Sequence, residues 1–478
     1  MTNDFRLLKP YTDRMPEECG VVGIYNAGDL PIPGSMYYAL HSVQHRGEES
    51  CGMAIAGEQG GIRYHKDMGL VTDVMTDEAL ENIGNGRVAI GHVRYSTQAE
   101  NLAINAQPLV VRSRKGQLAL AHNGNLINAV TLRRELEEDG TIFQTAVDSE
   151  VMANLIARST KGALAEAIPE MMARVRGSYA LVAMNEKQLV GVRDPFGIRP
   201  LCLGRKGNSY ILASESCAIE VLGGEYIRDI RPGEIIMIDD DGIHSIQTKA
   251  ADKSALCVFE FVYFARTDST MDGIGVYNAR YEAGRLLAQI APVEADLVVG
   301  VPDSALPAAM GYAKASGIPY GDGLVKNRYI GRTFIQPEQS MREQGVRMKL
   351  AALRRNVHGK RIVLVDDSIV RGTTSLQIVE MLRMAGARQV HMRISSPPVV
   401  SPCYFGIDTP DKDQLIGANH SVEEIAKMIG VDSLAYLDID GLQRTVEYGN
   451  CGFCMGCFTG EYPMDVKETC ECVCKSKK

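Results

Sequence analysis

The spacing of apolar and polar positions changes character near residue 250. Before that point, short alternating stretches are separated by Gly, Asp and Asn turns, a pattern typical of strands in a sheet. It predicts strands at 86–93, 117–121, 178–184 and 234–238, and helical periodicity predicts helices at 35–45 and 148–159. This mixture predicts a layered α+β architecture for the first half of the chain.

Beyond residue 256, predicted strands alternate with longer helical patterns. The strands are expected at 296–301, 361–366 and 389–394, and the helices at 284–290 and 375–385. Because parallel strands need a long crossover, usually a helix, this order predicts βαβ units and a parallel sheet. The polar stretch 248–254 marks the expected boundary between the α+β half and the α/β half.

Composition and charge narrow the class of protein. The 478 residues suffice for two or three domains, and 45% hydrophobic with 23% charged residues is ordinary for a globular protein. The net charge of −8 argues against a nucleic-acid binder as a whole. No apolar run approaches the roughly 18–20 residues of a membrane span. Residues 1–18 lack the apolar core of a secretory signal, so we expect a cytoplasmic protein without membrane segments.

The most informative motif spans residues 362–375. An apolar stretch ends in Asp366 and Asp367, and a helical pattern follows a short loop and helix start made of Arg371, Gly372, Thr373, Thr374 and Ser375. Ligands of open α/β sheets bind at the carboxyl ends of the strands, and N–H groups at a helix start can hold a phosphate. An ordinary βα turn with a capped helix is the simpler alternative.

This motif resembles the phosphoribosyl-diphosphate (PRPP) motif of the type I phosphoribosyltransferases. The resemblance implies that Asp366 and Asp367 contact the ribose hydroxyls and that residues 371–375 bind the 5-phosphate. Some transcriptional regulators keep this fold and bind the ligand without turnover. The motif alone therefore leaves both an enzyme and a sensor open.

Two neighbouring features fit the same family. The stretch 296–301 is followed by a loop with Ser304, and the resemblance implies that Ser304, Asp366 and Asp367 surround one Mg²⁺ per subunit, an ion that prefers oxygen ligands. The segment 326–355 carries eight basic residues against two acidic ones, which favours a polyanion site. The resemblance implies a lid over PRPP with three substrate ligands, Lys326, Arg328 and Lys349. A nucleic-acid patch is the competing interpretation.

Several motifs of the first half surround Cys19, which follows two glutamates and precedes the apolar stretch 20–25. They are the runs Gln44-His45-Arg46-Gly47, Gly91-His92-Val93-Arg94-Tyr95-Ser96-Thr97, His122-Asn123-Gly124-Asn125 and Asp148-Ser149-Glu150. A single cysteine at a strand start is usually a small core residue. Together, however, these motifs resemble the class II glutamine amidotransferases, which are N-terminal-nucleophile hydrolases with an αββα fold.

That resemblance implies that residues 1–18 are a propeptide and that Cys19 becomes the first residue of the mature chain. The α-amino group of Cys19, with an ordinary pKa of about 7.7–8.0, would then serve as its general base. The side chain of Asn123 and the N–H of Gly124 would form the oxyanion hole. An attached propeptide with an inert Cys19 is the alternative.

The same resemblance implies a glutamine pocket. Arg94 would bind the α-carboxylate of glutamine through its fork of donors, and Asp148 would pair with the α-ammonium. We interpret His92 and His122 as structural, because a free amine makes an imidazole base unnecessary.

A glutaminase joined to a PRPP site resembles the glutamine PRPP amidotransferase family. This implies ammonia transfer from glutamine to PRPP through a sealed passage, giving 5-phosphoribosylamine in purine synthesis. Family membership also suggests a homotetramer inhibited by purine nucleotides. The expected domains are a propeptide at 1–18, a glutaminase at 19–250, a type I phosphoribosyltransferase at 251–450 and a Cys-rich segment at 451–478. A non-catalytic PRPP sensor and a peptidase-like hydrolase are the alternatives.

The twelve cysteines cluster toward the end of the chain, with six in the last 28 residues. Cys257, Cys403, Cys454 and Cys457 match the ligands of the iron–sulfur branch of the family, which implies one [4Fe–4S] cluster per subunit. Zinc in four thiolates stays open. Cys451 extends the C-x-x-C run and offers an alternative ligand. No role follows for three further cysteines, Cys470, Cys472 and Cys474.

Overall fold

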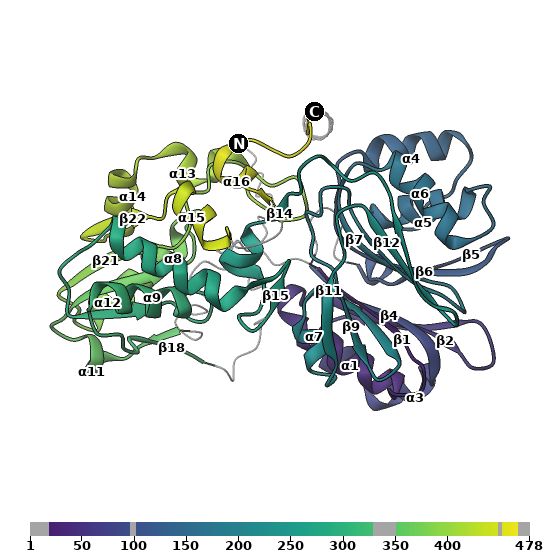
Figure 1. The fold of residues 1–478 in the computed structure, drawn as a ribbon. Coiled ribbons are helices and arrows are strands. Elements are labelled where there is room, and N and C mark those ends of the chain that lie inside the picture. The colour runs from purple at the N-terminus through teal and green to yellow at the C-terminus, as the bar shows by residue number, and fades with distance from the viewer. Residues whose placement is uncertain (1–18, 96–101, 328–349, 448–451, 467–478) are drawn as a thin grey trace, which may run out of the picture.

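The computed structural model describes residues 19–95, 102–327, 350–447 and 452–466, arranged as two sheet-containing halves side by side (Figure 1). The first half contains two antiparallel sheets. The seven-stranded sheet has the order β11 (Glu225–Asp229), β9 (Cys202–Lys206), β10 (Ser209–Ala213), β1 (Gly20–Tyr25), β4 (Gly86–Arg94), β2 (Ser50–Gly57) and β3 (Ile62–Met68). The six-stranded sheet has the order β13 (Gly242–Gln247), β12 (Glu234–Asp239), β8 (Leu189–Arg193), β7 (Gly177–Met184), β6 (Gly116–Leu126) and β5 (Leu109–Ser113).

The two sheets pack face to face. Apolar side chains of both sheets form one buried cluster between them, including Val21, Ile90, Ala121, Val182 and Leu212. The outer face of the first sheet is covered by α1 (Ile32–Ser42), α2 (Val71–Val74), α3 (Asp77–Ile83) and α7 (Cys217–Glu220). The outer face of the second is covered by α4 (Ala129–Glu138), α5 (Ser149–Arg158) and α6 (Leu164–Arg174). The layers are therefore αββα, which confirms the fold that the resemblance to the class II glutamine amidotransferases implied (Figure 1).

The second half is built on a parallel sheet with the order β17 (Leu297–Gly300), β20 (Arg361–Asp366), β21 (Gln389–Ile394) and β22 (Ser433–Tyr436). Alternate residues of β20 enter two cores. Val363 and Val365 pack with α8 (Val276–Ile290) and α9 (Leu306–Ser316), whereas Ile362 and Leu364 pack with α12 (Thr373–Met384) and α14 (Val422–Ile429). A strand covered on both faces needs a nearly continuous apolar sequence, which is why its pattern could be recognised.

Smaller elements connect the larger ones in both halves. They are η1 (Gln44–Arg46), η2 (Ala103–Asn105), β14 (Leu256–Cys257), the π-helical turn η3 (Glu260–Phe264), β15 (Thr270–Met271), β16 (Ile274–Gly275), β18 (Leu324–Lys326), β19 (Leu350–Ala352), α11 (Arg354–Val357), η4 (Lys412–Gln414), α13 (Ile416–Asn419), α15 (Ile439–Val446), β23 (Phe453–Cys454) and α16 (Gly456–Thr459). The halves share a core, because Ile127 and Ile198 of the first half belong to the cluster formed by α8 and α9. Among the described helices, none is long and apolar enough to cross a lipid bilayer.

Two predicted elements were too short. Strand β6 continues past the expected end at residue 121 to Leu126, because its pairing with β7 extends to the Leu126–Gly177 pair. Helix α8 begins at Val276, two turns before the expected start at residue 284. The helix expected at 35–45 divides into α1 and the 3-10 turn η1.

Candidate functional site

Cys19 lies at the start of β1, next to the end of β4. Gly20 is opposite Val93 in the antiparallel register, which brings Cys19 beside Arg94. The Cys19 thiol donates a hydrogen bond to the carbonyl oxygen of Tyr95 at 3.5 Å. Burial raises the pKa of this thiol to about 11, and the positive charge of Arg94 offsets only part of that effect. Near neutral pH the group is therefore a thiol, which needs a base to become a nucleophile.

The predicted oxyanion residues lie inside strand β6 rather than in a loop. Asn123 is opposite Ala180, and Gly124 is opposite Tyr179. Gly124 has a φ of +140°, and a Cβ there would lie 2.1 Å from the carbonyl oxygen of Ser178, so only glycine fits. The Asn123 side chain is 1% exposed, and its Nδ2 has no hydrogen-bond partner among the residues that the structure describes. A buried donor without a partner is available for a substrate oxygen.

Asp148 precedes α5 and contacts two residues of strand β6. One carboxylate oxygen accepts a hydrogen bond from the N–H of Leu126 at 2.9 Å, and the other lies 3.5 Å from Nδ1 of His122. Burial alone would raise the pKa of Asp148, but the charge of His122 and these hydrogen bonds outweigh it and lower the pKa. The carboxylate is therefore charged near neutral pH, as the partner of an ammonium group must be.

His92 is buried within β4 and is poorly suited to be a base. Burial lowers its pKa to about 3. Its Nε2 lies 3.1 Å from the carbonyl oxygen of His122. These observations agree with a structural role.

The second group of predicted residues lies at the carboxyl edge of the parallel sheet. Asp366 and Asp367 are 6% and 3% exposed, and Ser304 is brought to them from the loop after β17. The Ser304 hydroxyl donates to one oxygen of Asp367 at 2.5 Å, and the Ser368 hydroxyl donates to the other at 2.6 Å. Four oxygen-bearing side chains thus meet at this edge, and their chemistry suits a hard cation.

The loop that follows leads directly into α12. Gly372 has a φ of +87°, and a Cβ there would lie 2.9 Å from the Cδ1 of Ile416. The helix begins at Thr373, so Thr373, Thr374 and Ser375 form its first turn. At 12 residues, this helix has an N-terminal dipole and N–H groups directed at the sheet edge.

The basic segment is described only at its two ends. The Lys326 ammonium lies 2.7 Å from a carboxylate oxygen of Asp303, next to Ser304. Arg371 donates to the Gln414 side chain at 3.1 Å. Arg328 and Lys349 lie outside the described residues, as do the propeptide expected at 1–18 and most of the expected lid.

The four cysteines expected to bind a cluster converge through the backbone. Cys257 of β14 is the register partner of Cys454 of β23. The Cys457 carbonyl accepts hydrogen bonds from Val400 and Ser401, close to Cys403 in the chain. Burial raises the pKa of Cys454 to about 12. Four soft thiol donors from three segments suit a cluster or zinc, although no three His, Cys, Asp or Glu side chains of the described ranges are grouped as a metal site. Cys451 and the three last cysteines lie outside those ranges.

Two buried charges at the nucleophile were not assigned a role from the sequence. Arg46 and Glu260 lie 214 positions apart, and form an ion pair at 2.8 Å beside Cys19. Arg46 belongs to the run Gln44-His45-Arg46-Gly47, but no local spacing indicates that it meets Glu260.

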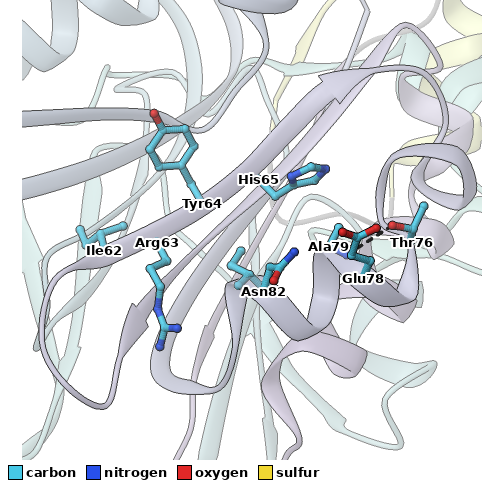
Figure 2. A pocket seen from close by; sticks show the side chains of 9 residues that line it. Ile62, Arg63, Tyr64, His65, Thr76, Glu78, Ala79 and Asn82 are labelled. Carbon is cyan, nitrogen blue, oxygen red and sulfur yellow. Dashed lines mark hydrogen bonds between the residues drawn. The ribbon is translucent and has the colours of Figure 1, made fainter.

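A surface hollow of about 550 Å³ lies away from both groups of residues. It is lined by the edge strand β3 and by α3, and Figure 2 shows Arg63, Tyr64, His65 and Glu78 around it. The hydroxyl of Thr76 in this hollow accepts a hydrogen bond from the Ala79 N–H and caps α3. No residue predicted to be functional lines it.

The fold and the two groups of residues define a glutamine amidotransferase joined to a phosphoribosyltransferase. The glutamine amidotransferase domain family matches residues 92–221, and the phosphoribosyl transferase domain family matches residues 278–395. The chain is 50% identical over 459 residues to the amidophosphoribosyltransferase of Archaeoglobus fulgidus, covering 95% of this chain and 100% of the relative. It is 50% identical over 455 residues to that of Bacillus subtilis, covering 94% and 95%.

Solved structures give the same result. The B. subtilis glutamine PRPP amidotransferase complexed with ADP and GMP has a TM-score of 0.87 and 49% identity, over 94% of this chain and 98% of that chain. The chain therefore belongs to the amidophosphoribosyltransferase family. It is an enzyme that transfers ammonia from glutamine to PRPP, giving 5-phosphoribosylamine, glutamate and diphosphate in the first committed step of purine synthesis.

Proposed function

We propose that this chain performs the family reaction with Cys19 as the glutaminase nucleophile and the Asp366–Asp367 edge as the PRPP site. One observation supports the glutaminase assignment above all: Asn123 Nδ2, a buried donor without a partner among the described residues, lies on strand β6, in the sheet that packs against the sheet of Cys19. A catalytic enzyme needs such a donor, whereas a PRPP sensor with a vestigial glutaminase does not.

In the glutaminase reaction, removal of residues 1–18 gives Cys19 a free α-amino group. This amine takes the thiol proton, the sulfur attacks the glutamine amide carbon, and the proton passes to the leaving ammonia, which leaves a γ-glutamyl thioester on Cys19. Water, deprotonated by the same amine, then hydrolyses the thioester, which releases glutamate and restores the thiol. Asn123 and the Gly124 N–H hold the oxygen that becomes negative. Arg94 binds the α-carboxylate and Asp148 the α-ammonium of glutamine.

In the second reaction, ammonia displaces diphosphate from C1 of PRPP. Asp366 and Asp367 hold the ribose hydroxyls, and residues 371–375 hold the 5-phosphate through N–H groups and hydroxyls. Lys326, Arg328 and Lys349 neutralise the diphosphate. Ser304, Asp366 and Asp367 hold one Mg²⁺ per subunit, directly or through water, and Mg²⁺ supplies charge for the leaving diphosphate.

The thiol set Cys257, Cys403, Cys454 and Cys457 holds one [4Fe–4S] cluster per subunit. A cluster there supplies a structural link between β14, β23 and the segment around Cys403. Zinc bound by the same four thiolates is the alternative, and chemical analysis for iron, acid-labile sulfide and zinc distinguishes the two.

We also propose that purine nucleotides inhibit the enzyme. The B. subtilis structure contains ADP and GMP, which supports purine nucleotides as inhibitors of this chain. We also propose that the chain assembles as a homotetramer. Its glutaminase domain would span residues 19–250, its phosphoribosyltransferase domain 251–450 and its Cys-rich segment 451–478.

The test combines intact-mass analysis with two cysteine variants. The mature chain should lack residues 1–18, and Cys19→Ala should lose glutamine hydrolysis while keeping ammonia-dependent diphosphate release. Cys51→Ala is the matched control, because Cys51 is a fully buried core residue. It should keep both activities per folded molecule. A retained propeptide in active enzyme, or glutamine hydrolysis by Cys19→Ala, would overturn the assignment.

A further inference from the structure

Arg46 and Glu260 form a buried ion pair that joins the two halves of the chain beside the nucleophile. Arg46 ends η1, and Glu260 begins η3. The Glu260 carboxylate accepts hydrogen bonds from both terminal nitrogens of Arg46, at 2.8 and 3.0 Å. The two residues are 1% and 0% exposed, so this pair is shielded from water and from salt.

The same guanidinium also contacts the backbone of Cys19. Its Nε donates a hydrogen bond to the Cys19 carbonyl oxygen at 3.1 Å. Both the sulfur and the α-amino nitrogen of Cys19 extend from the backbone that this contact holds. Because the donors of arginine lie in one rigid plane, the position of Glu260 is transmitted to Cys19 without a flexible joint.

Two further charges of the first half, Glu215 and Arg199, and a backbone N–H of the second half fix this arrangement. The Glu215 carboxylate accepts from Arg46 at 2.7 Å and from the N–H of Arg266 at 2.9 Å, just beyond η3. An Arg199 terminal nitrogen lies 3.8 Å from Glu260. Two arginines and two glutamates therefore meet in the interior, and their opposite charges offset the cost of burying each one.

We propose that Arg46 and Glu260 are a positioning pair that aligns the Cys19 backbone with the oxyanion strand β6. The pair acts on attack by the sulfur, not on the binding of glutamine. This inference rests on the proposed role of Cys19. A purely architectural ion pair would instead lower both enzyme activities together as the fold weakens.

The test is Arg46→Lys, which keeps the charge and removes the rigid fork. We expect the glutaminase kcat to fall about 10–100-fold, because small misplacements of a reacting group have effects of that size. The KM for glutamine and the ammonia-dependent release of diphosphate should each stay within about 2-fold. Glu260→Gln keeps the shape and one acceptor oxygen, so its fall in kcat should be smaller, about 3–10-fold.

Arg193→Lys is the matched control. The Arg193 guanidinium is also buried, makes a two-bond ion pair with Asp272, and donates to three backbone carbonyls. Arg193 joins β8 to the segment between β15 and β16. Its replacement therefore measures the effect of losing an equally buried arginine between the two halves. Its glutaminase kcat should stay within about 2-fold of the unchanged enzyme.

All measurements use chains that intact mass shows to begin at Cys19, with thermal unfolding recorded for each. An unchanged kcat in both Arg46→Lys and Glu260→Gln would overturn the inference. So would a parallel fall of both activities that Arg193→Lys reproduces at equal stability. Glutamine hydrolysis by Cys19→Ala would overturn the proposed nucleophile instead, which separates the two failures. If Arg46→Lys does not fold, the kcat of Glu260→Gln decides.

Discussion

Replacing Asn123 with alanine should separate catalysis from stability. In the free enzyme, Asn123 Nδ2 is buried and finds no hydrogen-bond partner within the described parts of the chain. Such a donor costs about 1–3 kcal/mol in the folded state. Alanine removes that cost and leaves a small cavity, so the two effects oppose each other, and we expect the free energy of unfolding to change by less than about 1 kcal/mol.

The effect on the reaction should be far larger. A donor that binds the oxyanion stabilises the transition state by about 2.7–4 kcal/mol. The glutaminase kcat of Asn123→Ala should therefore fall about 10²–10³-fold. Ammonia-dependent diphosphate release should be unchanged, because it needs no oxyanion at this strand. The assays are glutamate formation, diphosphate release with ammonium, and urea unfolding.

Asn128→Ala is the matched control for this prediction. Asn128 is also buried, but its side chain donates to the Arg174 carbonyl at 2.9 Å and accepts from the Arg176 N–H at 2.9 Å. This variant should lose about 1–3 kcal/mol of stability and keep its glutaminase kcat per folded molecule. A glutaminase kcat for Asn123→Ala within about 3-fold of the unchanged enzyme would refute the oxyanion assignment.

Four further changes test other parts of the structure. Burial raises the pKa of Asp229 to about 6, so the folded chain binds more protons than the unfolded chain between about pH 4 and 6. The free energy of unfolding should therefore fall as the pH rises through 6. Asp229→Asn should flatten this fall in urea unfolding at pH 5 and 7.5, and an unaltered fall would contradict the assignment. Gly311→Ala places a Cβ 2.0 Å from the Tyr281 carbonyl oxygen, and should cost about 3 kcal/mol or more in the same assay; unchanged stability would count against this helix contact. Asp367→Asn should reduce ammonia-dependent activity about 10–100-fold and raise the Mg²⁺ concentration required, while glutamine hydrolysis persists; an unchanged Mg²⁺ titration would argue against a ligand role. Cys454→Ser should lower iron and acid-labile sulfide per chain, whereas stoichiometric zinc in the unchanged protein would replace the cluster proposal.

The sequence predicted the parts of the fold in which burial follows a simple period. Strand β20 was recognised at its full length because both of its faces are apolar. Strand β6 was predicted too short because His122 and Asn123 are polar, yet they are buried within the sheet. A polar side chain buried for chemistry breaks the pattern on which strand prediction depends.

The start of α8 shows the same effect in a helix. Arg280 lies on its buried face and donates to the carbonyls of Phe261, Tyr263 and Ala265 at 2.7–2.9 Å. A charge on the buried face interrupts the apolar period, so the expected helix began only at residue 284. The interruption was a structural signal, because this arginine holds the turn η3.

The candidate site was predictable where its residues stand in short motifs. Cys19, Asp366 and their neighbours were recognised by such motifs and their resemblance to known families. The pairing of Arg46 with Glu260 was not, since it depends on how the two halves pack. Such a contact has no local sequence period.

Ammonia released from glutamine at Cys19 should be transferred to PRPP. The most direct measurement supplies PRPP and glutamine labelled with ¹⁵N in the amide, together with unlabelled ammonium, and follows glutamate, diphosphate and the trapped amine in one mixture. We expect ¹⁵N in the amine, in an amount equal to the glutamate formed. Glutamate without diphosphate, or an amine that carries only unlabelled nitrogen, would contradict this expectation.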